Sequence, residues 1–148
     1  MKTLIVYDSA YGNTEQVAKA MAGAIGADAR LLRAADFKPD DLKAIGLLIA
    51  GSPTNGGRPL PSVMDFLGKI PAGSLKDVKV AAFDTRISTR WVGVFGFAAG
   101  RIAKELQNKG GVPASPPEGF FVKGTKGPVT EGELERAAGW VRGIATGK

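Results

Sequence analysis

Ser9, Gly12 and Thr14 lie in a short polar stretch, YDSAYGNT, that separates a strand-like run from a helix-like run. The first N–H groups of a helix have no intrahelical partner, and the helix dipole adds positive potential there, so this stretch favours an anion. Gly12 permits a tight backbone path, and the hydroxyl groups add further donors. The alternative is that Ser9 or Asn13 only caps the helix.

The stretch lacks two known phosphate-binding patterns, and their absence limits which anion it could bind. An ATP-type phosphate loop needs Gly-Lys-Ser/Thr, and there is no lysine between Tyr7 and Thr14. The three glycines of a dinucleotide-binding fingerprint are absent as well. What remains is a neutral cradle that suits a phosphate monoester. A second stretch, KGTKG at residues 123–127, lacks the full spacing of a phosphate loop, and we interpret it as a β-turn connection.

Runs of apolar residues alternate with segments of helical periodicity along the chain. Strands are predicted at residues 3–7, 29–32, 45–50, 78–83 and 119–122, and helices at 13–25, 60–70, 97–109 and 131–145. This alternation predicts an α/β fold, a doubly wound five-stranded parallel sheet with helices on both faces, in a single domain of residues 1–148. Ligands bind such sheets beyond the carboxyl ends of the strands, which favours the loops at 8–14, 51–59 and 84–96.

The 148 residues contain no histidine and no cysteine, so we predict no catalytic residue and no metal site. The net charge is +6; residues 1–74 carry 8 basic and 7 acidic residues, a net +1, and residues 75–148 carry 12 and 7, a net +5. The basic residues are scattered, which does not favour nucleic acid. The charge indicates either an acidic partner or a solvated surface.

The hydropathy pattern predicts no association with a membrane. No apolar run reaches the roughly 18 residues of a membrane span. Met1 leads directly into the first strand, without the apolar region and cleavage site of a signal peptide. We therefore expect a cytoplasmic location.

The segment IVYDSAYGNTEQVA, residues 5–18, resembles the flavin-phosphate loop of the flavodoxin family. That loop has two apolar residues, an aromatic residue, a Ser or Thr two positions later, a small residue, and a Thr that opens a helix with Ala four residues on. The strand–helix alternation extends the resemblance over nearly the whole chain, at the length of the short-chain flavodoxins. The resemblance implies a flavodoxin-like sheet of strand order 2-1-3-4-5 and non-covalent binding of FMN, with the phosphate held by Ser9, Ala10, Tyr11, Gly12, Asn13 and Thr14.

Flavodoxins hold the flavin ring between the loops that follow the third and fourth strands. The resemblance therefore implies ring contacts from Pro53, Thr54, Asn55, Gly56 and Gly57 and from Asp84, Thr85, Arg86 and Trp91. The peptide before or after Gly56 would accept the flavin N5–H after one-electron reduction, unless the loop is an ordinary β-turn. Asp84 either pairs with Arg86 or caps a turn. Alternatively, backbone and side-chain groups of Asp84, Thr85 and Arg86 contact the pyrimidine edge of the flavin. Trp91 either stacks on the ring or anchors in the surface or the core.

Two features depart from the family pattern. The loop at 51–59 has no aromatic residue, so one flavin face is covered by Pro53 and the glycines or left open. Flavodoxins are usually acidic, whereas Arg58, Arg86 and Arg90 fall in the ring loops here. Positive charge would stabilise the reduced, anionic flavin, so we expect a less extreme low-potential couple than in a usual flavodoxin, which a redox titration would test.

The resemblance predicts an FMN-binding electron-transfer protein that works with a redox partner protein, and an acidic partner would complement the basic half of the chain. Two alternatives stay open. An FMN-dependent reductase of a quinone or another small molecule is favoured by the open ring face. A flavin-free interaction module of the same fold is favoured by the missing aromatic residue.

Overall fold

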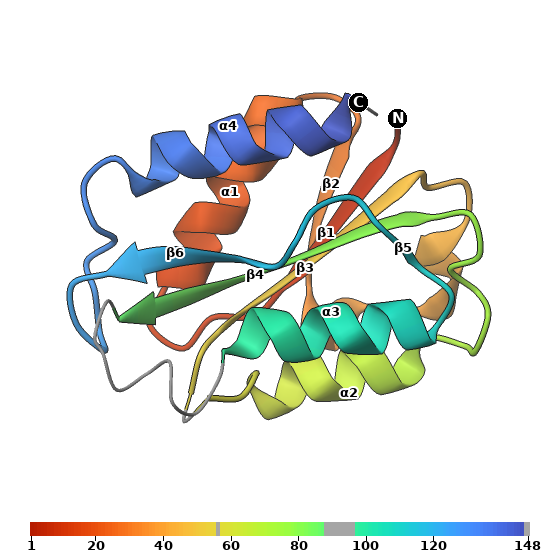
Figure 1. The fold of residues 1–148 in the computed structure, drawn as a ribbon, viewed down its shortest axis with the longest axis horizontal. Helices are drawn as coiled ribbons and strands as arrows, with labels where there is room; N and C mark the ends of the chain where they lie inside the picture. The colour runs from red at the N-terminus through yellow and green to blue at the C-terminus, as the bar shows by residue number, and fades with distance from the viewer. Residues whose placement is uncertain (56, 88–96, 147–148) are drawn as a thin grey trace.

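The computed structural model describes residues 1–55, 57–87 and 97–146. Its centre is a parallel sheet (Figure 1), with strands β1 (Thr3–Tyr7), β2 (Ala29–Arg33), β3 (Leu47–Pro53), β4 (Lys79–Ile87), β5 (Val112–Pro113) and β6 (Glu118–Val122). The strands follow the order β2-β1-β3-β4-β5, and β6 also pairs with β4. The predicted doubly wound parallel sheet and its strand order are therefore confirmed.

The fifth position of the sheet holds two short strands instead of the one that the sequence predicts. β5 pairs with Lys79 and Val80 at the start of β4, whereas β6 pairs with residues 83–87 at its end. Pro116 and Pro117 fall between the two strands, and proline has no N–H group to donate to a neighbouring strand. The pairing is interrupted there, and β6 then runs to the same edge of the sheet as β4.

β3 and β4 continue past residues 50 and 83, where the apolar pattern predicts their ends. Their parallel register extends through the pairs Ser52 with Asp84 and Pro53 with Thr85, and β6 pairs with β4 as far as Ile87. Neighbouring strands on both sides satisfy the backbone of β4, so polar side chains do not end it. Asp84 and Thr85, with Arg86 after them, therefore lie in a strand and not in the predicted loop at 84–96.

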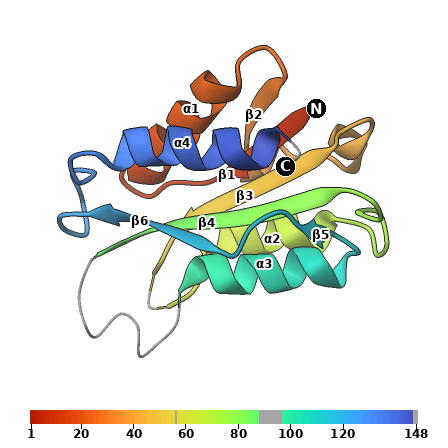
Figure 2. The same ribbon diagram turned by 45° about the horizontal axis from the view of Figure 1, so that its top comes forward.

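Two helices cover each face of the sheet (Figures 1 and 2). α1 (Asn13–Ile25) and α4 (Glu133–Ala145) lie on one face, and α2 (Pro61–Lys69) and α3 (Ala98–Asn108) lie on the other. Two short 3-10 helices, Ala34–Asp36 and Pro39–Leu42, connect β2 to β3. None of the helices in the described ranges is both long and apolar enough to cross a membrane.

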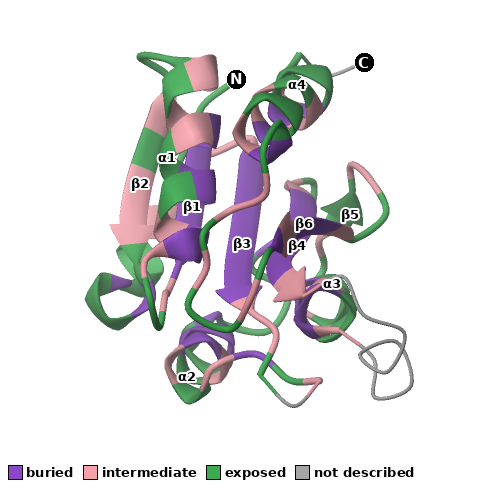
Figure 3. Ribbon diagram, turned by 90° about the vertical axis from the view of Figure 1, so that its left-hand side faces the viewer, coloured by how far each residue is buried: buried purple, intermediate pink, exposed green. Residues whose placement is uncertain are grey.

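The central strands are buried on both faces, as their continuous apolar runs predict (Figure 3). Side chains of β1 alternate between two apolar clusters. Leu4 and Val6 pack in the cluster under α2 and α3, whereas Ile5 packs in the cluster under α1 and α4. In the second cluster the rings of Phe83 and Phe120 meet edge to face, with centroids 6.1 Å apart. This core fixes the carboxyl ends of β1, β3, β4 and β6 at one edge.

A buried carboxylate ties α4 to β6. Glu133 is 8% exposed, accepts the N–H of Phe121 at 2.8 Å and pairs with Arg136 at 2.8 Å. The Arg136 guanidinium also donates to the Gly119 carbonyl and lies 4.5 Å from the centroid of the Phe120 ring. The hydrogen bond from Arg136, with that from the Phe121 N–H, holds the pKa of Glu133 below its usual value.

This pKa shift predicts a loss of stability in acid. The folded-state pKa of Glu133 lies below the unfolded value of about 4.3, so its contribution is present above that pH and is lost as the pH falls through the lowered pKa. Glu133→Gln should lower the free energy of unfolding at neutral pH by about 1–3 kcal/mol and flatten its slope in acid. Urea unfolding at several pH values measures both.

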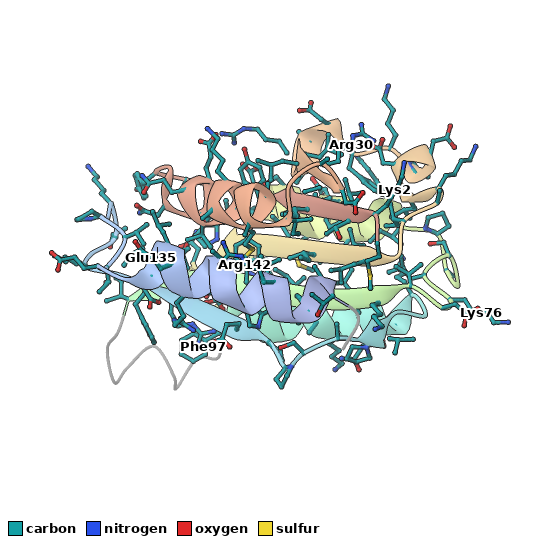
Figure 4. The ribbon with its side chains drawn as sticks, turned by 90° about the horizontal axis from the view of Figure 1, so that it is seen from above. Lys2, Arg30, Lys76, Phe97, Glu135 and Arg142 are labelled. Carbon is teal, nitrogen blue, oxygen red and sulfur yellow. The ribbon has the colours of Figure 1, made fainter. Side chains whose placement is uncertain are left out.

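The matched control for this prediction is Glu135→Gln. Glu135 lies on the same helix but is exposed (Figure 4), so its substitution should leave the acid slope nearly unchanged. An acid slope that is equally steep in Glu133→Gln and in the unsubstituted protein would contradict the role given to Glu133.

Candidate functional site

A cavity of about 350 Å³ lies where the strands end, within the usual range of about 300–1,000 Å³ for small-molecule sites. It is bounded by the loop after β1, the loop after β3, the end of β4 and the turn after β6. Its walls are formed by Ser9, Ala10, Tyr11, Asn13, Thr14, Pro53, Thr54, Asn55, Gly57, Leu60, Thr85, Arg86, Ile87, Val122 and Thr125. Phe97, at the start of α3, lies toward this end of the molecule, far from Lys2 and Lys76 (Figure 4).

Most of the predicted site residues line this cavity together. Gly12 and Asp84 do not line it, although each supports a residue that does. Gly56 and Trp91 lie outside the described residues, as does Arg90. The stacking and anchoring alternatives for Trp91 therefore both stay predictions.

The loop between β1 and α1 leaves the first turn of α1 without a side-chain cap. Gly12 is the N-cap residue, with a left-handed φ of 92°, and its N–H donates to Ser9 Oγ at 2.9 Å. Gly12 has no side chain with which to cap the helix, and Ser9 Oγ accepts the N–H of Gly12 itself, so neither Ser9 nor Asn13 is the N-cap residue. The first-turn amides and the hydroxyl hydrogen of Ser9 can therefore bind an anion.

Hydrogen bonds and an ion pair of Asp8 hold this loop in place. Its Oδ1 accepts the Ser9 N–H at 2.7 Å and Arg33 Nη1 at 3.1 Å, and its Oδ2 accepts the hydroxyl of Ser62 on α2. Arg33 also pairs with Glu15 on α1 at 3.2 Å. Asp8 thus bonds the loop to β2 and α2, and Arg33 gives both carboxylates near the start of α1, those of Asp8 and Glu15, a cationic partner.

Thr14 and Thr85 join the first loop to the end of β4. Their hydroxyl oxygens are 2.8 Å apart, and the two residues are 1% and 4% exposed. The N–H of Thr54 donates to the Thr85 carbonyl at 2.9 Å, which adds the loop after β3. A hydroxyl group donates one hydrogen bond and accepts up to two, so Thr14 keeps hydrogen-bonding capacity for a ligand.

The loop after β3 forms a tight turn at the cavity. The N–H of Asn55 donates to the Arg58 carbonyl at 2.8 Å, and the N–H of Arg58 donates to the Asn55 carbonyl at 3.1 Å. Gly57 has a left-handed φ of 82°. The Asn55 carbonyl, one of the two predicted acceptors of a flavin N–H, is thus bonded within the turn here. That acceptor role stays a prediction.

Asp84 forms the predicted pair with Arg86 and also caps α3. The carboxylate is fully buried, and it accepts Arg86 Nε at 2.6 Å and Nη2 at 2.8 Å. Its Oδ2 also accepts the Ala99 N–H at 2.9 Å, and Thr54 Oγ1 accepts the Ala98 N–H at 3.0 Å. Asp84 therefore lies behind Arg86, and it is Arg86 that reaches the cavity wall.

The Arg86 guanidinium is held in a narrow slot. It lies over the Phe97 ring, 3.4 Å from its centroid. On β6, a Cβ added to Gly119 would come within 2.1 Å of Arg86 Nε, so only glycine leaves room there. Asp84 offsets the charge of Arg86, so of the arginines expected to raise the flavin potential, Arg86 should contribute less than the exposed Arg58.

Four cavity residues escape the sequence analysis. Leu60 and Val122 are apolar, and nothing in their local pattern separates a cavity wall from the core, whereas Ile87 falls within the expected loop at 84–96 but is not among the predicted contacts. Thr125 lies in the turn at 123–127, where the predicted β-turn is present, since the Gly127 N–H donates to the Gly124 carbonyl at 2.9 Å. This turn follows the last strand of a parallel sheet, so the rule that placed the other three loops at the site could have placed it there too.

Comparisons with known proteins identify the fold and the family of this chain. A family model described as flavodoxin matches residues 5–140. A flavodoxin from the domain Archaea is 24% identical, with a TM-score of 0.78 over 99% of this chain and 98% of that one. Oxidised Flavodoxin 2 from Bacillus cereus is 22% identical, with a TM-score of 0.82 over 100% of both chains.

A similar fold also occurs inside a larger protein. The rubredoxin oxygen:oxidoreductase of Desulfovibrio gigas is 23% identical, with a TM-score of 0.76 over 98% of this chain and 35% of that one. Identities this low show a shared fold only. A comparison with curated proteins found no match.

Proposed function

Because the chain belongs to the flavodoxin family, we propose that it binds FMN non-covalently in the cavity at the sheet edge and carries electrons for a redox partner protein. The observation that carries the proposal is the uncapped start of α1, which opens with Ser9 and Thr14 into a cavity of about 350 Å³. Helix starts of this kind bind phosphate groups.

The residues of the cavity fit a cofactor that has a phosphate and an apolar ring. Hydroxyl and amide donors come from the loop between β1 and α1, where Ser9 and Thr14 line the cavity. Apolar wall is supplied by Leu60, Ile87 and Val122. Small-molecule sites typically combine apolar walls with a few placed polar groups in this way.

Bound FMN would supply the redox chemistry, and the chain would supply binding, orientation and electrostatics. Ser9 and the first-turn amides of α1 would hold the phosphate. The Thr14–Thr85 bond fixes the distance between the phosphate loop and β4. Arg86 lines the cavity, and Asp84 and Phe97 set the orientation of its guanidinium.

Reconstitution with FMN tests this proposal. The protein should take up added FMN with a visible flavin absorbance band and quenched flavin fluorescence. It should bind riboflavin, which lacks the phosphate, more weakly, because hydrogen bonds to a charged group are worth about 1.5–3 kcal/mol each. Protein that takes up neither flavin would refute the proposal and favour the flavin-free module.

A reductase of a quinone or another small molecule is the second candidate. The wall contributed by the loop after β3 consists of Pro53, Thr54, Asn55, Gly57 and Leu60, with no aromatic residue among them. A ring face without an aromatic cover would admit a small substrate. Steady-state oxidation of a nicotinamide cofactor by a quinone, with the FMN-loaded protein, would identify the reductase, and its absence would favour the carrier.

The partner of a carrier is proposed to present an acidic surface. The net charge of +6 and the exposed Arg58 beside the cavity would attract such a surface over a long range. Electron transfer to an anionic small-molecule acceptor should then slow as salt is added, whereas transfer to a cationic acceptor should not. The opposite salt dependence would contradict an acidic partner.

A further inference from the structure

We propose that the turn at residues 123–127 is part of the phosphate site, and that Lys126 supplies the positive charge that the loop before α1 lacks. The inference rests on the proposed binding of FMN. It assigns a binding role to a lysine that lies more than a hundred residues after that loop.

The turn after β6 is well defined. The Lys123 N–H donates to the Pro128 carbonyl at 2.9 Å, and the Gly127 N–H donates to the Gly124 carbonyl at 2.9 Å. Val122 and Val129 form an antiparallel bridge at its base. These bonds leave Thr125 and Lys126 at the tip of the turn.

The tip lies against the loop that precedes α1. Thr125 lines the same cavity as Tyr11 and Asn13. Gly127 packs directly on Asn13, since a Cβ at Gly127 would lie 2.5 Å from Asn13 Oδ1. Lys126 Nζ lies 6.0 Å from the centroid of the Tyr11 ring. The turn thus lies against both the loop, at Tyr11, and the first residue of α1, Asn13.

The charge balance at this place favours a dianion. The loop offers amides and hydroxyl groups, and its nearby carboxylates, Asp8 and Glu15, are paired with Arg33. Lys126 forms no salt bridge within the described ranges, and its ammonium group lies over the Tyr11 ring. A phosphate monoester carries a charge of about −1.5 to −2 at neutral pH. Lys126 would offset part of that charge across the cavity mouth.

The effect should be moderate and sensitive to salt, because Lys126 is exposed. If Lys126 acts on the phosphate, its substitution must change the Kd for FMN and leave the Kd for riboflavin nearly unchanged. If Lys126 contributes only to the overall positive potential of the protein, substituting another lysine of the same turn must change the Kd for FMN by the same factor. Lys123 is the matched comparison: neither lysine lines the cavity and both are exposed, but Lys126 lies at the tip of the turn, 6.0 Å from the Tyr11 ring, whereas Lys123 lies at its base.

The experiment is a titration of FMN and of riboflavin, followed by flavin fluorescence, with the full chain and its K126Q, K126R and K123Q variants. K126Q should raise the Kd for FMN about 3- to 10-fold at low salt, leave the Kd for riboflavin within about 2-fold, and weaken the salt dependence of FMN binding. K126R should restore the affinity, and K123Q should change it by less than about 2-fold.

Two results would overturn the inference while leaving FMN binding intact. One is an unchanged Kd for FMN in K126Q. The other is an equal loss in K126Q and K123Q, or an equal loss for FMN and riboflavin. A chain that binds no FMN in any form would instead overturn the proposed function and this inference together.

Discussion

Asp84→Asn is expected to lower the free energy of unfolding by about 3 kcal/mol, at the lower end of the cost of breaking a buried ion pair. Asp84 is fully buried, and its carboxylate binds two guanidinium nitrogens of Arg86 and the N–H of Ala99. Asparagine keeps the volume but leaves the Arg86 side chain, only 16% exposed, without its counter-charge. Urea unfolding measures the loss.

A double-mutant cycle separates this pair from the other roles of Asp84. Arg86→Met alone should also destabilise, since it leaves a buried carboxylate, and the double variant should lose less than the sum of the two. Glu105→Gln is the surface control: Glu105 pairs with Arg101 at 3.6 Å with both side chains partly exposed, and its loss should cost about 0.5 kcal/mol or less. Equal losses in Asp84→Asn and Glu105→Gln would refute the buried pair.

The elements of the first half show what local sequence determines. The predicted bounds of β1 and α1 agree with the structure, because the apolar run ends at Tyr7 and apolar residues recur at helical spacing after Gly12. β4 is the contrary case. Asp84, Thr85 and Arg86, near its end, are polar, so the hydropathy pattern predicts that the strand ends before them. They stay in the strand because β3 and β6 pair with them, and neither neighbour can be read from the local pattern.

The candidate site likewise has a part that the local sequence predicts and a part that depends on the fold. The loop before α1 carries its own signature, so the sequence alone identifies the residues there that line the cavity. The contacts between loops need the fold. Thr14 and Thr85 are 71 positions apart and meet as hydroxyls at 2.8 Å. Thr125 reaches the cavity only because β6 ends beside β4. Such contacts depend on strand order, which the family resemblance supplies and periodicity alone does not.

Thr14→Val is expected to raise the Kd for FMN about 10- to 100-fold, the effect of losing one hydrogen bond to a charged group. Thr14 lies in the uncapped first turn of α1, lines the cavity, and is 1% exposed. Valine has nearly the same shape, so the packing is retained while the donor is lost. Binding of riboflavin should change much less, because the missing partner is the phosphate. Fluorescence titration with both flavins measures the difference.

The Thr14–Thr85 pair provides the decisive control for this prediction. Thr85→Val removes the same 2.8 Å hydrogen bond and leaves Thr14 its hydroxyl group. Both valine variants orphan one buried hydroxyl and should lose a similar free energy of unfolding, about 1–3 kcal/mol. Only Thr14→Val should lose phosphate-dependent affinity, and Thr14→Ser should regain it. If Thr85→Val weakens FMN binding as much, Thr14 acts by holding β4 in place and does not bind the phosphate.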